Sequence, residues 1–191
     1  MAEVRESEVR RVVREVVERA LADQAVPSEQ TAVRPAEGGA KRVAVGSDHG
    51  GYGLKEVLKR YIAEELGWEV VDCGTHSTDA VDYPDYAAAV AREVSGGRCA
   101  RGIVVDAAGI GSTMAANKVP GIRCALCHDD VTVLNAREHN DANVLALGAR
   151  IVHRGLAARM VRLFLTTGFG GGRHERRVQK IMALERGGAA R

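Results

Sequence analysis

The sequence predicts an α/β fold, a Rossmann-like three-layer sandwich built on a five-stranded parallel sheet. From about residue 42 onward, short runs of Val, Ile, Leu and Ala alternate with longer amphipathic segments. This alternation is typical of a parallel sheet covered by helices on both faces. The chain has 191 residues, of which 46% are hydrophobic. That length allows one sizeable core and is too short for two typical domains with linkers.

Each element follows from its local pattern. The strand-like runs are short and apolar, and Gly and Asp residues often follow them. The longer segments place apolar side chains three and four residues apart, as one face of a helix requires. The predicted strands are residues 43–47, 68–73, 102–105, 122–127 and 144–147, and the predicted helices are residues 54–66, 83–94, 112–118, 131–138, 156–166 and 174–185.

The start of the chain differs from the rest. Its apolar residues recur at helical spacing among arginines and glutamates, and the stripe consists of Val9, Val12, Val13, Val16, Val17 and Leu21. This pattern predicts an amphipathic helix over residues 1–22. Residues 23–41 are rich in Pro, Gly and small polar residues and are predicted to be a flexible linker. Residues 42–191 are then predicted to form a single domain.

An amphipathic helix on a linker needs a surface to bind. Residues 1–22 resemble the targeting peptides that load enzymes into bacterial microcompartments, so one interpretation is docking to a shell protein or another cargo enzyme. The alternative is packing on the chain's own domain or oligomer assembly. Membrane-surface binding is disfavoured because glutamates are mixed with the arginines and no aromatic anchor is present.

Composition excludes several function classes. With 27 basic and 25 acidic residues the net charge is +2, and aromatic residues make up 4%. Neither value favours a nucleic-acid surface. No apolar run approaches the length of a membrane span. The expected location is cytoplasmic, inside a microcompartment if the N-terminal helix is a targeting peptide.

The four cysteines are predicted to be free thiols. Cys73, Cys99, Cys124 and Cys127 occur without a secretory signal, and at least two lie in apolar strand-like runs. The sequence from Cys124 to His128 superficially resembles a metal or haem motif. It lies in a predicted strand and has no second ligand pair, so we expect no metal there.

A strand, a glycine turn and a helix start follow one another between residues 102 and 118. Asp106 ends the apolar run, and Gly109 and Gly111 allow a tight bend before the helix. The free N–H groups of a helix N-terminus attract negative charge, so this turn is predicted to bind an anion. Asp106 would repel that anion or serve as a base beside it. Taken alone, the segment fits an ordinary strand, turn and helix equally well.

Two further polar clusters accompany this turn. Asp48 and His49 follow the first predicted strand, and residues 137–141, Arg-Glu-His-Asn-Asp, precede the fifth. Parallel sheets bind ligands at the carboxyl ends of their strands, where Asp48, His49 and Asp106 are predicted to lie. Residues 137–141 could reach the same crevice. Together the three clusters predict a ligand site.

Six collinear motifs span most of the chain beyond the linker, about residues 42–185. They are Gly46-Ser-Asp48-His49-Gly-Gly-Tyr52-Gly-Leu-Lys55, Asp72-Cys-Gly-Thr-His76, Asp82-Tyr83-Pro84, Ala115-Ala-Asn117-Lys118-Val-Pro-Gly121, Arg137-Glu-His139-Asn140-Asp-Ala-Asn143 and Gly171-Gly-Arg173-His174-Glu-Arg-Arg177. These motifs resemble the ribose-5-phosphate isomerase B family, which also holds the galactose-6-phosphate isomerase subunits.

The resemblance implies an aldose–ketose isomerase, an enzyme of carbohydrate metabolism that interconverts sugar phosphates through an enediolate without metal or cofactor. It further implies a homodimer or homotetramer with active sites between subunits. Asp48 and His49 would contact the substrate, and Tyr83 would line the pocket. His139 would help to open the sugar ring, with Asn140 beside it.

The same resemblance implies which residues bind the phosphate and which stabilise the enediolate. Arg150, Arg173 and Arg177 would hold the phosphate, and planar guanidinium groups suit that role because they form bidentate bonds to phosphate oxygens. Without the resemblance, the last two arginines would fit a solvated helix face. Charge on the enediolate oxygens would be stabilised by Asn117 and by the turn of Gly109, Ile110, Gly111 and Ser112.

The sequence departs from the family pattern at the expected base. Many ribose-5-phosphate enzymes have a cysteine base where this chain has Asp106, and a threonine where it has Ala108. Other members place a glutamate base at the position of Ser112. A carboxylate is chemically competent, because triosephosphate isomerase uses one. An ordinary aspartate, with a pKa of about 3.9, is a weak base unless its surroundings raise that value.

Several interpretations therefore remain open. The chain is expected to isomerise ribose 5-phosphate with Asp106 as base, or to act on a four-carbon or six-carbon sugar phosphate. Alternatively it is a half-site or non-catalytic subunit, resembling the galactose-6-phosphate isomerase A subunit. A nucleotide-binding regulatory module is disfavoured, because Asp48 stands where a dinucleotide pyrophosphate needs bare glycine backbone.

Overall fold

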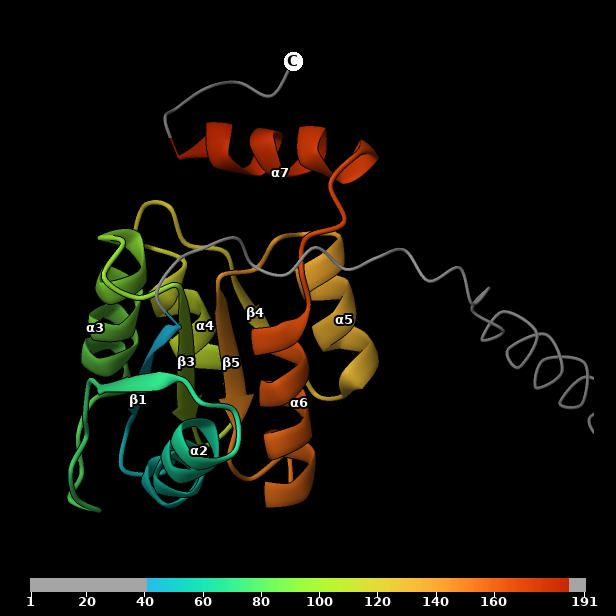
Figure 1. Cartoon of the computed structure of the whole chain (residues 1–191). Helices are drawn as coiled ribbons and strands as arrows, with labels where there is room; N and C mark the ends of the chain where they lie inside the picture. The colour runs from blue at the N-terminus through green and yellow to red at the C-terminus, as the bar shows by residue number, and fades with distance from the viewer. Residues whose placement is uncertain (1–40, 186–191) are drawn as a thin grey trace, which may run out of the picture. The chain divides into compact units, whose positions relative to one another are not determined.

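The structure, a computed structural model, describes residues 41–185. The predicted N-terminal helix, and the predicted linker except for its last residue, lie outside this range. The elements in chain order are β1 (Arg42–Ser47), α2 (Tyr52–Glu64), β2 (Glu69–Asp72), α3 (Tyr83–Ser95), β3 (Arg101–Asp106), α4 (Ile110–Ala116), β4 (Cys124–Leu126), α5 (Asp130–Glu138), β5 (Val144–Gly148), α6 (Arg154–Thr166) and α7 (Arg173–Leu184) (Figure 1).

The five strands form one parallel sheet in the order β2-β1-β3-β5-β4. Residues at corresponding heights pair across it: Ser47 of β1 with Val105 of β3, and Asp106 of β3 with Gly148 of β5. The predicted fold class and all five predicted strands are therefore confirmed. The carboxyl ends of β1, β3 and β5 lie side by side at one edge of the sheet.

Two apolar layers cover the sheet. Alternate residues of a strand face opposite sides, so Ile103 packs in the layer formed with α2, α5 and α6, whereas Val104 packs in the layer formed with α3 and α4. Both side chains are fully buried or nearly so. Each such side chain contributes about 1.5–3 kcal/mol by leaving water, which makes the sheet a rigid support for the loops at its edges.

Element boundaries differ from the sequence prediction by one or two residues for local reasons. Helix α4 begins at Ile110 rather than at Ser112, because Gly109 in the left-handed conformation (φ 81°) supplies the bend. Helix α5 begins at a capping box in which the Asp129 carboxylate accepts from the Thr132 N–H at 2.7 Å. Strand β4 is three residues shorter than predicted, from Cys124 to Leu126.

Helix α7 differs from the other helices, because Val178 is its only buried residue within the described range. Polar contacts attach it instead to the loop before β4: Arg123 Nη1 lies 3.3 Å from Met182 Sδ, and the Gly121 N–H donates to the Glu185 carboxylate at 3.0 Å. None of the helices between residues 41 and 185 is long and apolar enough to cross a membrane.

Candidate active site

The loop after β1 carries the first two predicted site residues. The Asp48 side chain is buried, and its Oδ1 accepts from the Gly51 N–H at 2.9 Å. His49 Nδ1 lies 3.2 Å from both the N and the O atoms of Val81, in the segment before α3. A Cβ added to Gly50 would lie 3.4 Å from the Ala107 Cβ. The loop is therefore closely packed against the turn that follows β3.

Asp106 lies at the carboxyl end of β3 and is 5% exposed. Its Oδ1 accepts from the backbone N–H groups of Ala108, at 2.8 Å, and of Gly109, while its Oδ2 accepts from the N–H of Ser112 at 3.0 Å. Two of these donors, the N–H groups of Gly109 and Ser112, belong to the start of α4, which the sequence predicted to bind an anion. In this structure the anion they bind is the chain's own carboxylate.

Tyr83 and Arg150 lie next to this turn. The Tyr83 ring covers Gly111, where an added Cβ would come within 2.5 Å of two ring carbons. Tyr83 remains 41% exposed, so its outer part faces solvent. The Arg150 backbone N–H donates to the Ala107 carbonyl at 3.0 Å, and its side chain is exposed. The first cluster at the carboxyl edge thus contains Asp48, His49, Tyr83, Asp106, the turn of Gly109, Ile110, Gly111 and Ser112, and Arg150.

A second cluster forms around the end of α5. His139 caps the C-terminus of α5, and its ring stacks on that of His174, with centroids 4.1 Å apart and planes at 5°. The pKa of His174 is lowered by loss of hydration and by the neighbouring positive charges of His139, Arg173 and Arg177. The stack thus joins the predicted ring-opening histidine to the helix that carries two predicted phosphate ligands.

Two arginines hold the turn that contains His139 and Asn140. The next residue, Asp141, has a positive φ of 46°, and its carboxylate accepts from Arg137 and from Arg123, both at 2.9 Å. Arg123 Nε also donates to the Asn140 carbonyl at 3.2 Å. Burial lowers the pKa of Arg137, although the bond to Asp141 opposes this change. A paired, buried guanidinium therefore fixes the backbone that carries His139.

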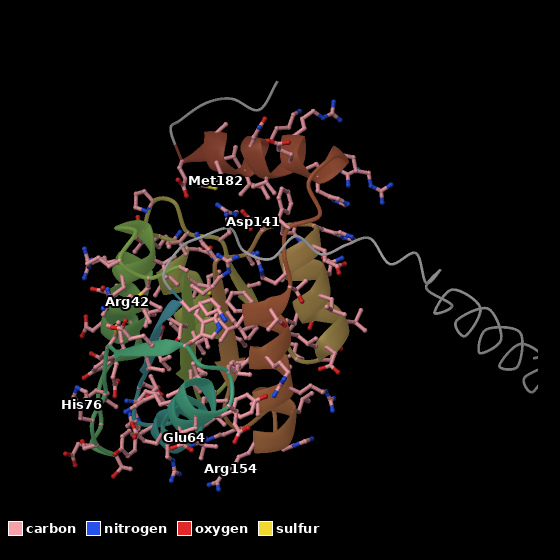
Figure 2. The ribbon with its side chains drawn as sticks, in the orientation of Figure 1. Arg42, Glu64, His76, Asp141, Arg154 and Met182 are labelled. Carbon is pink, nitrogen blue, oxygen red and sulfur yellow. The ribbon has the colours of Figure 1, made fainter. Side chains whose placement is uncertain are left out.

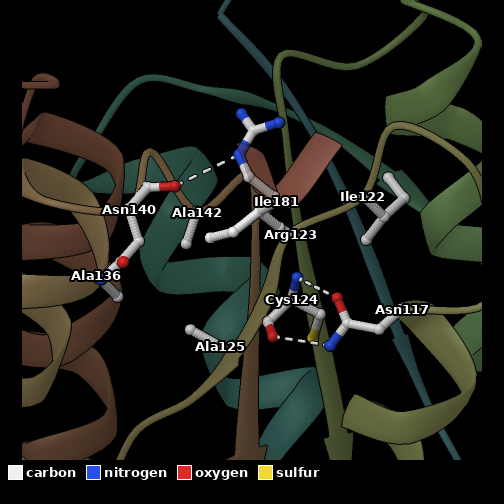
Figure 3. Close-up of a pocket in the computed structure, with 9 residues that line it drawn as sticks. All are labelled: Asn117, Ile122, Arg123, Cys124, Ala125, Ala136, Asn140, Ala142 and Ile181. Atoms are coloured by element: carbon white, nitrogen blue, oxygen red, sulfur yellow. Dashed lines mark hydrogen bonds between the residues drawn. The ribbon is translucent and has the colours of Figure 1, made fainter. Parts of the chain in front are cut away.

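Asn117 lies at the far end of α4 from the glycine turn. Its Oδ1 accepts from the Cys124 N–H at 2.8 Å, and its Nδ2 donates to the Cys124 carbonyl at 2.9 Å. Figure 3 shows both bonds at the wall of a pocket of about 270 Å³. Within one chain, the Asn117 amide therefore binds the start of β4 and does not reach the Gly109 turn. The pocket is lined by Asn117, Ile122, Arg123, Cys124, Ala125, Ala136, Asn140, Ala142 and Ile181.

The two clusters lie at opposite ends of the sheet. Val144, at the start of β5, pairs with Gly102, whereas Gly148, at its end, pairs with Asp106. Four residue steps along a strand span about 13 Å. In Figure 1 the arrowheads of β3 and β5 point away from α7, and Figure 2 places Asp141 and Met182 at one end and His76 at the other. Within one chain, His139 and Asp106 are therefore well separated.

Comparison with known proteins shows the family to which this chain belongs. A family model described as Ribose/Galactose Isomerase matches residues 43–181. The chain belongs to the ribose/galactose isomerase family. Membership confirms the family resemblance and the predicted enzyme class, an aldose–ketose isomerase.

The matches to individual relatives extend over nearly the whole length of each relative. Ribose-5-phosphate isomerase B of Escherichia coli is 43% identical over 145 residues, 76% of this chain and 97% of the relative. A putative sugar phosphate isomerase of Bacillus subtilis is 46% identical, covering 75% and 97%. The solved structure of Clostridium thermocellum ribose-5-phosphate isomerase B is 48% identical with a TM-score of 0.75, covering 76% and 98%.

The side-chain contacts of some residues in this isomerase could not be predicted from the sequence. His174 stands in one of the quoted motifs, but nothing in the spacing shows that its ring covers His139. Lys55 and Asp72 also stand in such motifs, 17 residues apart, yet their side chains form an ion pair at 2.8 Å. Within residues 41–185, no group of three or more His, Cys, Asp or Glu side chains has the arrangement of a metal site.

Proposed function

We propose that this chain interconverts an aldose phosphate and its ketose without a cofactor, by default ribose 5-phosphate and ribulose 5-phosphate, and that Asp106 is the base. The observation that carries the proposal is the place of the Asp106 carboxylate. It ends β3, next to the Asp48–His49 loop and to the turn under Tyr83. The names of the relatives in E. coli and C. thermocellum support the default substrate.

The hydrogen bonds of Asp106 favour Oδ2 as the oxygen that takes the proton. A carboxylate has about four lone-pair positions, and Oδ1 accepts two backbone bonds whereas Oδ2 accepts one. Oδ2 thus has one lone pair left, which takes the proton from C2 of the open-chain aldose. The C2–H electron pair forms the C1=C2 bond and the carbonyl pair moves to O1. The proton of the C2 hydroxyl then passes to O1, and the O2 electron pair forms the carbonyl at C2. The C1=C2 electron pair takes the proton back from Oδ2 at C1, which yields the ketose.

The other site residues bind the ends of the substrate. Arg173 and Arg177 are four residues apart on α7 and share one face of that helix, and with Arg150 they bind the phosphate. His139 opens the sugar ring, with Asn140 beside it. Both His139 and the α7 arginines lie at the amino edge, so within one chain they are separated from Asp106.

We therefore infer that two copies of the chain complete each site. One copy supplies the carboxyl edge with Asp106, and the other supplies His139, Asn140 and the α7 arginines. Exposed apolar side chains support this arrangement: Ile110 and Met114, on successive turns of α4, are 52% and 63% exposed. A homodimer, or a homotetramer built from such dimers, would cover them.

A second candidate function follows from the same hydrogen bonds. Because three backbone donors bind the Asp106 carboxylate, it can act as a structural cap of α4 rather than as a base. The chain would then be a half-site or non-catalytic subunit, active only with a cysteine-bearing partner. In that case Asp106→Cys would create activity that the natural chain lacks, whereas an Asp106 base predicts that the natural chain is itself active.

The test of function is a panel of four-, five- and six-carbon aldose phosphates assayed for ketose formation, with EDTA present. We expect turnover by the purified chain alone, fastest with ribose 5-phosphate. Faster turnover of a four- or six-carbon substrate would reassign the sugar, a change that Ala108 makes chemically reasonable. No turnover on any of them, followed by turnover after mixing with a cysteine-bearing homologue, would favour the half-site function.

We also propose that residues 1–22 dock the enzyme to a microcompartment shell or cargo protein, which would place it inside that compartment. The support is their apolar stripe and the linker composition of residues 23–41. Deleting residues 1–40 should leave activity and oligomeric state intact, and residues 1–40 fused to a fluorescent protein should co-localise with shells. Loss of activity on deletion would assign the segment a structural role.

A further inference from the structure

The most deeply buried ion pair described lies beside the Asp48–His49 loop. Lys55 on α2 is fully buried, and its Nζ lies 2.8 Å from Asp72 Oδ1 and 2.9 Å from Oδ2 at the end of β2. Glu56 Oε1 lies 3.0 Å from the same ammonium. Lys59 also donates to Asp72 from the next turn of α2, but its side chain is partly exposed. A fully buried ammonium is costly unless it is paired, so this position needs a reason.

The pair is connected to the loop through β2. Asp72 Oδ1 accepts from the Gly74 N–H at 2.9 Å. The Gly74 carbonyl accepts from the Ser47 N–H, and the Thr75 N–H donates to the Ser47 carbonyl, both at 2.7 Å. Ser47 directly precedes Asp48 in the chain. Asp72 therefore holds the turn that clamps the beginning of the loop.

The pair is also connected to the other end of the loop. Lys55 stands in the first turn of α2, where its N–H donates to the Gly51 carbonyl at 2.9 Å. Gly51 in turn donates to Asp48 Oδ1, and it leaves no space for a side chain, because an added Cβ would lie 2.2 Å from the Val105 carbonyl oxygen. The Lys55–Asp72 bond thus links α2, which follows the loop, to the end of β2, whose turn holds the end of β1 where the loop begins.

We propose that Lys55 and Asp72 are positioning residues of this isomerase, which set the place of Asp48 and His49 by clamping both ends of their loop. This inference rests on the proposed function, in which Asp48 and His49 contact the substrate. Neither Lys55 nor Asp72 touches substrate. Loss of the pair therefore shifts the substrate contacts while leaving the proton transfer at Asp106 largely unchanged.

Steady-state kinetics on the full-length chain with ribose 5-phosphate test this proposal. Lys55→Met keeps the apolar stem and removes the ammonium, and Lys59→Met is the matched control because Lys55 still binds Asp72. We expect Lys55→Met to raise KM by about tenfold or more, since small misplacements of binding groups are costly, with a much smaller change in kcat. Lys59→Met should leave both constants near the wild-type values.

A purely structural role would give a different result. It would lower the melting temperature and the active fraction, and hence the apparent kcat, while KM stayed unchanged, and that outcome would overturn the proposal. If Lys55→Met does not fold, Asp72→Asn takes its place, because the amide oxygen can still accept from Gly74 while the charge is lost.

An NMR readout separates this inference from the proposed function. The ring resonances of His49 report its position whether or not the chain turns over any sugar phosphate. We expect them to shift in Lys55→Met, with those of His128, on the segment after β4, unchanged. Unchanged His49 resonances in a folded variant would refute the positioning role, whereas an inactive wild-type chain with the expected shift would refute only the function.

Discussion

The backbone N–H of Ser112 donates to Asp106 Oδ2 at 3.0 Å, so the start of α4 binds a carboxylate of its own chain. Two more N–H groups, of Ala108 and Gly109, bind Oδ1. A thiol at position 106 would bind these donors weakly, and they would then be free for substrate oxygens. The aspartate therefore changes both the base and the anion-binding capacity of the turn.

Mixed oligomers test the shared site. Asp106→Asn and His139→Ala should each be inactive, because one alters the carboxyl edge and the other the amino edge. A dimer with one copy of each variant has one site with both changes and one site with neither. We expect such dimers, isolated with two different affinity tags, to show about half of the wild-type activity. Mixed dimers as inactive as their parents would place each site within a single chain.

Arg177→Ala should weaken substrate binding. A charge-assisted hydrogen bond to phosphate is worth about 1.5–3 kcal/mol, so KM should rise by about tenfold to a hundredfold with a smaller change in kcat. Arg92→Ala, which removes an exposed arginine from α3, is the matched control and should change neither constant. Equal KM values for the two variants would show that Arg177 does not bind the phosphate.

The stacking of His139 on His174 should affect the pKa of His174. The pKa of His174 is lowered from its ordinary 6.5, and His139→Ala should raise it by uncovering the ring and removing a neighbouring charge. NMR titration measures this, with Arg159→Ala on α6 as the control that leaves it unchanged. The native ring binds a proton less readily than the unfolded chain does, so its contribution to stability falls as the pH drops below about 6.5. A His174 pKa that is unaffected by His139→Ala would contradict the stacked arrangement.

Gly111 and Tyr83 should be energetically coupled. An alanine at position 111 would place its Cβ within 2.5 Å of the Tyr83 ring, and such overpacking costs about 1–3 kcal/mol of the free energy of unfolding. In a Tyr83→Ala background the same change should be neutral or stabilising by up to about 1 kcal/mol, because alanine favours helix. Urea unfolding of the four proteins gives this coupling, and additive effects would show that ring and glycine are not in contact.

The fold could be predicted from the sequence because the spacing of apolar residues differs between its strands and its helices. The central residues of β1, β3 and β5, 43–46, 102–105 and 144–148, are apolar, as is typical of strands buried on both faces. The prediction for β4 is too long because Ile122 and Cys127, on either side of it, are also apolar and buried, whereas residues in register with β5 extend only from Cys124 to Leu126.

The site could be predicted only in part. The convergence of Asp48, His49 and Asp106 follows from the rule that strands of a parallel sheet end at one edge. The donors bound by Asp106 and the stacking of His174 on His139 depend on side-chain directions that residue spacing does not encode. The separation of residues 137–141 from that edge follows from the direction of α5, which runs back to the amino ends of the strands. The sequence prediction left this placement open.

Exchange of the substrate C2 proton with solvent deuterium tests the assignment of Asp106 most directly. Wild-type protein incubated with ribose 5-phosphate in D₂O should incorporate deuterium at C2, as mass spectrometry would detect. Asp106→Asn, which keeps an oxygen acceptor for Ala108 and Gly109, should still bind the sugar phosphate by calorimetry but incorporate none. Deuterium incorporation by Asp106→Asn at the wild-type rate would show that another group is the base.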